Sequence, residues 1–292
     1  MTFFKPIRLW IILIAAGLLA LCFAAPNTQA AVNKTKPAKP PTTAAKPAEI
    51  PQNYSLRYRA FWGGVEAAEM EFSVSESKSD FDATFNFQTK GLINKLWKFV
   101  IDGETHGIFN SPTPSTRVYA ANSKLRGKEK RYSWSYDPKN KLARTIDDPN
   151  IENIISDDLR RDVTDPLGGI MQLRAMVRGA KNKSDLKSLT GQKIPVFDGR
   201  KRFDLIIQSV GGHDEKLGDK NYSLIDLGMS IVPIAGFKDR DSDNWKASKI
   251  TMSVADDGMY FPVKIQIDTD WATAIIRLSG GCIGKNCAQT GL

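Results

Sequence analysis

The sequence predicts a mainly β protein made of antiparallel strands, with one amphipathic helix packed on them. From Tyr54 onward, apolar and polar residues alternate, as they do in strands that bury one face. Gly, Asp or Asn interrupts this alternation roughly every ten residues, at the spacing of hairpin turns. One stretch, residues 165–179, has helical periodicity instead. We therefore predict a single β-rich domain over residues 54–280.

The first two strands form a hairpin whose register follows from the pattern. Its turn contains Gly63-Gly64, after an alternating stretch that begins at Tyr54. A two-residue loop would set Leu56 opposite Glu71 and place a carboxylate on the apolar face. A three-residue loop pairs Leu56 with Phe72 and keeps the apolar faces together, so we expect the longer loop.

The same register predicts two cross-strand ion pairs on the polar face of this hairpin. It sets Arg57 opposite Glu71 and Arg59 opposite Glu69. Opposite charges in such positions stabilise a sheet by roughly a few tenths of a kcal/mol per pair.

The rest of the domain divides into further strands and one long helix. Asp165 is expected to cap the helix, Pro166 to begin it and Gly179 to end it, with a broad apolar stripe between. A helix this apolar packs on the sheet. Further strands are expected at residues 81–88, 101–109, 116–121, 131–136, 143–146, 202–210, 222–226, 250–254, 261–268 and 272–278.

Residues 91–99 interrupt the strands with a short apolar stretch that fits either one helical turn or a bulged strand. Its large apolar residues are Leu92, Ile93, Leu96 and Trp97. They are candidates for an apolar lip that contacts a hydrophobic ligand. The alternative is that they belong to the core.

A basic stretch interleaved with aromatic residues runs through residues 124–136. Serines alternate with its aromatic residues, which predicts an ordinary strand with Trp134 pointing inward. A basic rim that faces anionic lipid is the other interpretation.

Residues 1–30 have the organisation of an export signal peptide. Two basic residues precede an apolar run over residues 9–25, and Thr28-Gln29-Ala30 suits signal peptidase. We expect cleavage between Ala30 and Ala31 and therefore a periplasmic protein. An uncleaved N-terminal membrane anchor is the alternative, although the apolar run is shorter than the roughly 20 residues that a spanning helix prefers.

Residues 31–53 form a Lys/Pro/Ala-rich linker that is expected to be disordered, because it has almost no large apolar side chain to bury. It is either a spacer that makes peripheral contact with a membrane or cell wall, or a solubilising leader without a partner. The formal charge of +9 includes +2 from the signal peptide and +3 from the linker, which leaves +4 for the body. That balance gives no indication of nucleic-acid binding.

Two cysteines remain after export, Cys282 and Cys287, in the C-terminal tail over residues 281–292. We expect a disulfide between them in an oxidising compartment. Two free thiols are the alternative, and a metal site is disfavoured because no histidine lies nearby in the sequence. Cys22 leaves with the signal peptide, and Leu21 stands where lipoprotein processing requires a small residue.

No assembled catalytic set is recognised, so we predict a non-enzymatic protein that uses no cofactor and no metal. His106 and His213 each lack a neighbouring Cys or His that could share a metal ion. Residues 239–244 resemble the opening of a calcium loop, but Asn244 replaces the turn glycine and Ile250 the bidentate glutamate. Residues 228–232 lack the final glycine of a hydrolase nucleophile elbow.

The acidic pair Asp157-Asp158 stands close to Arg160 and Arg161 in the sequence. We interpret this segment as a polar connection and not as the paired carboxylates of an active site, whose separation in space would have to be suitable.

Seven short segments carry a resemblance when they are taken together and in order: Trp62–Ala68, Thr89–Leu92, Asp165–Leu167, Leu173-Arg174, Phe197–Leu205, Pro233–Phe237 and Phe261–Ile265. They resemble a family of exported bacterial proteins, the domain of unknown function 3108. The resemblance implies a strongly curved antiparallel sheet with a helix, similar to the half-barrel of the periplasmic lipoprotein carriers LolA and LolB, and it implies no reaction.

These observations lead to a functional hypothesis with alternatives. We expect a periplasmic cell-envelope protein that binds an apolar or amphipathic ligand, such as a lipid or a lipoprotein segment, without catalysing a reaction. The first alternative is an envelope assembly or scaffold factor that binds protein partners. A hydrolase is the second.

Overall fold

The computed structural model describes residues 53–110, 113–147, 154–180, 182–217, 220–238, 242–243, 248–269, 272–284 and 287. The predicted signal peptide with its cleavage position at Ala30 and Ala31, the linker up to residue 52, and most of the calcium-like loop lie outside these residues. Within the described part, no helix is both long enough and apolar enough to cross a membrane.

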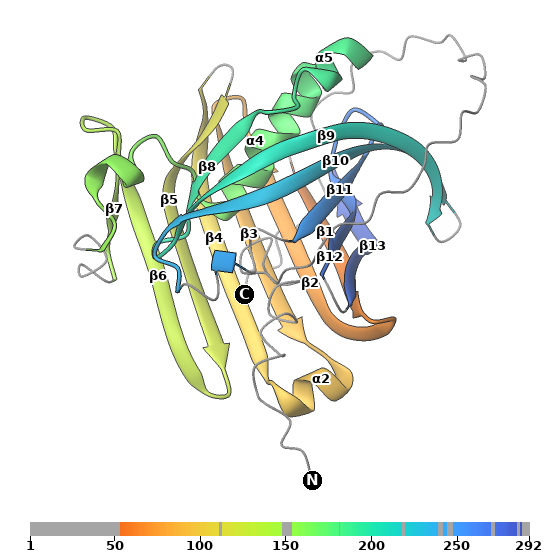
Figure 1. The fold of residues 1–292 in the computed structure, drawn as a ribbon, viewed down its shortest axis with the longest axis horizontal. Coiled ribbons are helices and arrows are strands. Elements are labelled where there is room, and N and C mark those ends of the chain that lie inside the picture. The colour runs from red at the N-terminus through yellow and green to blue at the C-terminus, as the bar shows by residue number, and fades with distance from the viewer. Residues whose placement is uncertain are drawn as a thin grey trace.

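One open antiparallel sheet forms the body (Figure 1). In the described residues it has 13 strands in the order β7-β6-β5-β4-β3-β2-β1-β13-β12-β11-β10-β9-β8, so each half of the chain forms a meander and the first strand pairs with the last. The prediction of a mainly β protein with a curved antiparallel sheet is confirmed. The strands are β1 Asn53–Trp62, β2 Val65–Glu76, β3 Asp80–Thr89, β4 Phe99–Asn110, β5 Thr113–Leu125, β6 Lys128–Asp137, β7 Leu142–Thr145, β8 Lys193–Phe197, β9 Arg202–Leu217, β10 Lys220–Ala235, β11 Lys249–Ala255, β12 Pro262–Asp268 and β13 Thr273–Ile283.

The predicted helix is α4, Pro166–Gly179, and it lies within the curve of the sheet, against β3, β4, β5 and β8 (Figure 1). It is capped by Asp165 and begins at Pro166, as expected. Three shorter helical elements occur among the residues that the structure describes: α2 over Gly91–Leu96, η2 over Asp157–Arg160 and α5 over Lys183–Lys187.

The register predicted for the first hairpin is confirmed, but its loop is shorter than expected. Leu56 pairs with Phe72, while Trp62 pairs with Val65 across a two-residue turn. Both turn glycines have a positive φ, which such a tight turn requires. The extra residue is absorbed by a bulge that begins between Ala60 and Phe61, so the apolar faces still meet.

The two edge strands of the sheet, β7 and β8, approach each other without forming a continuous ladder. Residues 161–164 fill the gap, with one isolated bridge to β7 and another to β8. Across the same gap, the indole Nε1 of Trp134 in β6 donates to the carbonyl oxygen of Phe197 in β8 at 3.0 Å. We call this region, residues 161–164 with Trp134 and Phe197, the seam.

The inner side of the sheet is filled by side chains around α4. The two crevices that line α4 have cavity volumes of about 0 and about 10 Å³. A cavity of this size holds at most one water molecule. Side chains therefore fill these two crevices beside α4, and an acyl chain fits in neither of them.

Candidate functional site

The short helix α2 lies at one rim of the body, remote from α5 (Figure 1). The sequence of this stretch fits either a helical turn or a bulged strand, and the structure shows the helical turn. Thr89 fixes its geometry, because the hydroxyl donates to Asn94 Oδ1 at 3.0 Å and accepts from the backbone N–H of Phe99 at 3.1 Å. The backbone N–H of Trp97 closes the turn on the carbonyl oxygen of Ile93 at 2.8 Å.

Two of the four predicted lip residues face the solvent. The side chains of Leu92 and Leu96 are 64% and 49% exposed. They are four positions apart and therefore share one face of the helix. Ile93 is buried against Ala67 and Trp97 is half-buried, so these two belong to the small core under the helix, which is the alternative that the sequence left open.

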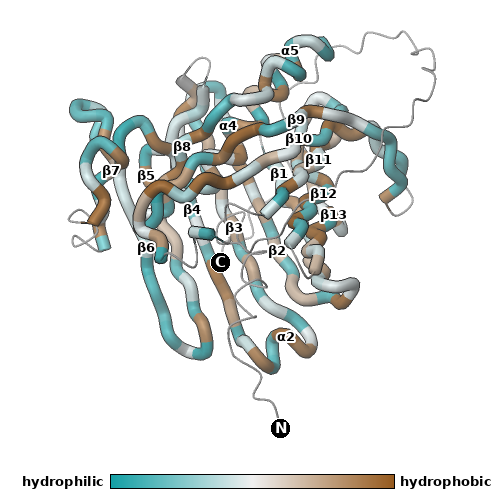
Figure 2. Tube along the Cα trace, in the orientation of Figure 1, coloured by the Kyte–Doolittle hydropathy of each residue, from teal (hydrophilic) through white to brown (hydrophobic). Residues whose placement is uncertain are grey.

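Basic side chains surround this apolar face. The β5–β6 turn packs beside α2, because the backbone N–H of Arg126 donates to the carbonyl oxygen of Lys98 at 2.9 Å. The guanidinium of Arg126 also donates to the carbonyl oxygen of Leu96 at 3.1 Å. Figure 2 shows hydrophobic residues in α2 next to hydrophilic ones in this part of the molecule. We call the exposed set formed by Val65, Leu92, Leu96, Lys95, Lys98 and Arg126 the α2 rim.

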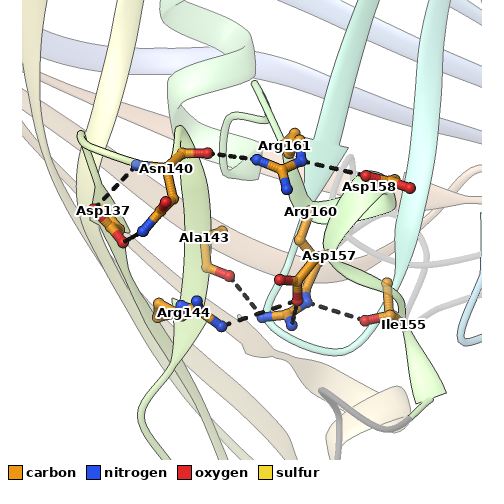
Figure 3. Close-up of polar contacts among 9 residues, drawn as sticks. All are labelled: Asp137, Asn140, Ala143, Arg144, Ile155, Asp157, Asp158, Arg160 and Arg161. Atoms are coloured by element: carbon orange, nitrogen blue, oxygen red, sulfur yellow. Dashed lines mark hydrogen bonds and ion pairs between the residues drawn. The ribbon is translucent and has the colours of Figure 1, made fainter.

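The acidic pair Asp157-Asp158 lies on the segment that covers β7 (Figure 3). Arg160 is completely buried and donates to the Ala143 carbonyl oxygen at 2.8 Å and to Asp157 at 2.7 Å. Asp158 accepts from Arg161 at 3.3 Å. Asp157 thus pairs with Arg160 and, at 3.9 Å, with Arg144, while Asp158 pairs with Arg161, and the segment is a polar connection.

His213 lies on the outer face of the sheet between two carboxylates. Its Nδ1 is 2.6 Å from Asp226 and its Nε2 is 3.1 Å from Glu215. The hydrogen bond to Asp226 raises the pKa of His213 above its ordinary value. Ser253 donates to Asp226 at 2.6 Å and not to the histidine, so the pair that would activate a serine is not formed by these residues.

The second histidine and the cysteines are also placed outside the α2 rim. His106 contacts Asp82 at 2.9 Å, and no group of three metal-binding side chains occurs among the described residues. Cys282 and Cys287 form a disulfide. Because β13 runs to Ile283, Cys282 lies in a strand and not in a tail.

Two buried polar groups hold α4 in place: Asp165 at its first end and Arg174 near its other end. The sequence predicts the cap at Asp165 but not the buried partners of either group. Asp165 accepts from Thr105 at 2.7 Å, from Thr116, and from the backbone N–H groups of Leu167 and Gly168 at 2.7 and 3.1 Å. Burial nevertheless raises the pKa of this carboxyl group. The cap is therefore a structural group that joins the helix to β4 and β5.

At the other end of α4, Arg174 forms a buried ion pair with Glu76. Its Nε donates to the carbonyl oxygen of Met259 at 2.6 Å, and its guanidinium lies 3.9 Å from the centre of the Phe261 ring. Its Nη1 donates to the hydroxyl of Tyr54 at 3.2 Å, and burial raises the pKa of that hydroxyl. These contacts bind the helix to β1, β2 and the loop before β12.

Several of the segments that resemble a known family therefore lie at the helix cap, in the buried ion pair and at the seam, and two others lie in the first hairpin and at the start of α2. A family model described as a protein of unknown function (DUF3108) matches residues 57–279. The chain belongs to this family. No curated protein matches the chain.

A solved structure extends the comparison for the DUF3108 fold. It is a β-barrel-like protein of the domain of unknown function DUF1849 from Brucella abortus, with a TM-score of 0.52 and 10% sequence identity. The match covers 82% of this chain and 100% of that chain. At this identity the likeness concerns the fold alone, and the similarity to lipoprotein carriers stays a prediction.

In this DUF3108 chain, several segments that carried the resemblance have structural explanations. Asp165 and Arg174 anchor the helix, and Phe197 accepts the seam hydrogen bond. Val65 and Leu92 of the α2 rim also lie in matching segments, but Leu92 and Leu96 have no folding role that would explain their exposure. The α2 rim is therefore the best candidate for a binding surface.

Proposed function

We propose that this DUF3108 protein is a non-enzymatic periplasmic protein of the cell envelope that binds an amphipathic ligand, a lipid or the acylated segment of a lipoprotein, at the α2 rim. The observation that carries the proposal is the exposure of Leu92 and Leu96 on a helix whose backbone is fixed by Thr89 and Arg126. A preformed apolar face needs no ordering on binding, which favours affinity.

The surface suits an amphipathic ligand because it combines apolar and cationic groups. Covering the exposed part of each leucine contributes about 1–1.5 kcal/mol, since complete burial of a leucine contributes about 1.5–3 kcal/mol. Each of Lys95, Lys98 and Arg126 adds about 1 kcal/mol near an anionic surface.

The rim is favoured over the interior for a physical reason. The crevices along α4 hold about 10 Å³ or less, whereas an acyl chain needs many times that volume. Binding without catalysis is supported by the state of the polar groups, because the carboxylates of Asp157, Asp158 and Asp226 are each engaged by neighbouring side chains.

Native mass spectrometry and lipid extraction test the proposal on protein purified from its own periplasm. We expect co-purifying lipid with the wild type, and its loss in a variant that carries Leu92→Ser and Leu96→Ser. Ile146→Ser is the control, because Ile146 is 58% exposed but directly follows β7 at the seam side of the body. This control should retain the lipid.

Three results would contradict the proposal. Absence of lipid from the wild type together with a co-purifying protein would favour the scaffold alternative. Equal lipid in all three proteins would place the ligand elsewhere. Turnover of an ester or glycan substrate that a single polar substitution abolishes would show an enzyme.

A further inference from the structure

A groove of about 460 Å³ lies on the outer face of the sheet, over the strands β13, β1, β2 and β3. Tyr58 points into the core, so its neighbours Arg57 and Arg59 point outward into the groove. The volume lies within the range of small-molecule sites. The groove is lined by Arg57, Tyr58, Arg59, Glu69, Met70, Glu71, Asn86, Gln88 and Ser279.

Two arginines, Arg57 and Arg59, line this groove, and Arg277 of β13 lies beside it, outside the lining. Arg59 pairs directly with Arg277, and Arg57 is two residues away on the same face. The hairpin register sets Arg57 opposite Glu71 and Arg59 opposite Glu69, as predicted. No ion pair of these arginines with a described residue forms, however, so that part of the prediction is wrong. The N–H groups of the three guanidinium groups are therefore not occupied by carboxylates of the described residues.

The glutamates of the groove have other hydrogen-bond and ion-pair partners than the arginines. Glu69 forms an ion pair with Lys90 at 2.6 Å and accepts from Gln88 at 2.6 Å. Glu71 accepts from the hydroxyl of Ser55 at 2.5 Å. The N–H donors of the guanidinium groups are consequently available to a ligand.

An irregularity in β13 keeps the groove open beside Arg57. The register shifts there and leaves Ser279 as an extra residue, whose hydroxyl donates to the carbonyl oxygen of Arg57 at 3.1 Å. Gly280 lies opposite Arg57, and a Cβ at this glycine would stand 3.6 Å from the arginine Nη2. Bulges re-aim side chains, and glycine in a strand often marks a close approach.

We propose that this groove binds a phosphorylated polar ligand through the guanidinium groups of Arg57, Arg59 and Arg277. A guanidinium offers a planar fork of N–H donors that matches two phosphate oxygens, so it suits this group better than an ammonium does. The polar lining suits a sugar phosphate or a phosphate-bearing headgroup. This site is separate from the α2 rim and does not depend on the function proposed there.

Isothermal titration calorimetry with glucose 6-phosphate, and with glucose as the neutral probe, tests the proposal on the full chain. We expect the wild type to bind the phosphate ester and not glucose. The variant with Arg59→Gln and Arg277→Gln should lose at least tenfold in affinity. The variant with Arg131→Gln and Lys139→Gln loses the same charge on exposed positions of β6 and its turn, and should bind as the wild type does.

The melting temperature without ligand shows whether the variant with Arg59→Gln and Arg277→Gln folds as the wild type does. The substitutions remove both the repulsion between Arg59 and Arg277 and the attraction between Arg59 and Glu69, so the melting temperature should stay close to the wild-type value. Equal binding of glucose, or equal affinity of the two charge variants, would overturn the proposal.

Vesicles distinguish the two sources of phosphate. Flotation with vesicles of phosphatidylglycerol is compared for the same two variants. Loss of glucose 6-phosphate binding with unchanged vesicle binding assigns the groove to a soluble sugar phosphate. Parallel loss of both assigns it to a lipid headgroup, and retention of both contradicts the proposal.

Discussion

Replacing Trp134 with alanine removes the largest buried side chain at the seam. The indole is 0% exposed, its ring lies 6.2 Å from the ring of Phe197 and 6.3 Å from that of Tyr119, and its N–H donates to the Phe197 carbonyl oxygen. The substitution therefore removes the aromatic contacts and the hydrogen bond that join β6 to β8. It also leaves a cavity where the edges of the sheet meet.

The expected loss of stability is about 4 kcal/mol. A tryptophan buries about 150–250 Å², which at about 25 cal/mol per Å² corresponds to about 4–6 kcal/mol. Replacement of a buried Phe or Trp by alanine typically costs about 3–5 kcal/mol because the cavity collapses only in part. For a domain of this size, that loss lowers the melting temperature by about 8–16 °C.

Urea unfolding followed by far-ultraviolet circular dichroism measures this loss without depending on tryptophan fluorescence. Trp134→Phe keeps a ring but removes the donor, and should cost clearly less than the alanine variant. Trp97→Ala is the matched control, since Trp97 is only half-buried at the α2 rim, and should cost about 1–2 kcal/mol. A loss below about 1.5 kcal/mol for Trp134→Ala would refute the packed seam.

Three further predictions follow from the polar groups. Asp165→Ala should destabilise the chain by about 3 kcal/mol in urea unfolding, because it removes a buried cap that accepts from four donors. Reduction of the disulfide between Cys282 and Cys287, or Cys282→Ser, should cost only about 2 kcal/mol, since the closed loop is short. Asp226 raises the pKa of His213 above 6.5 in the folded chain. The stabilisation of the fold by protonated His213 is therefore complete below the pKa that this histidine has in the unfolded chain, and it is lost as pH rises through the pKa in the folded chain. The stability difference between wild type and His213→Gln should therefore be larger at about pH 6 than at about pH 9, and a constant difference would contradict it.

The register of the first hairpin could be derived from the sequence because a shift by one residue would have moved a carboxylate onto the apolar face. Leu56 and Phe72 pair as expected. The loop length could not be derived in the same way, since a shorter turn with a bulge gives the same pairing beyond the bulge. The bulge depends on the backbone geometry near Ala67, which alternation does not report.

The edge strand β8 was not predicted, because Pro195 interrupts its pattern. Proline is tolerated in an edge strand, because its missing N–H is not needed for a hydrogen bond to a further strand. The inward position of Trp134 was predicted correctly from the alternating serines. Its role at the seam could not be, because Phe197 lies 63 residues away in the sequence.

The candidate sites could also be predicted only in part, because some of their features depend on neighbouring residues and others on residues far away in the sequence. The helical spacing of Leu92 and Leu96 is local, and a helix over these residues places both on one face. Whether that face points to solvent could not be predicted, because it depends on which side of the helix packs on Ala67. In the structure Ala67 packs on Ile93, and the leucines stay exposed. Likewise, the arginine groove requires the pairing of Arg59 with Arg277, which the first and last strands bring together.

Site-specific photocrosslinking tests most directly whether the ligand sits at the α2 rim and not inside the body. A diazirine amino acid is placed at Leu96 or, as an interior control, at Met171 of α4, and the protein is irradiated in its own cells. We predict lipid adducts at Leu96 and none at Met171, which is buried in the core. Adducts at Met171 with none at Leu96 would contradict the account.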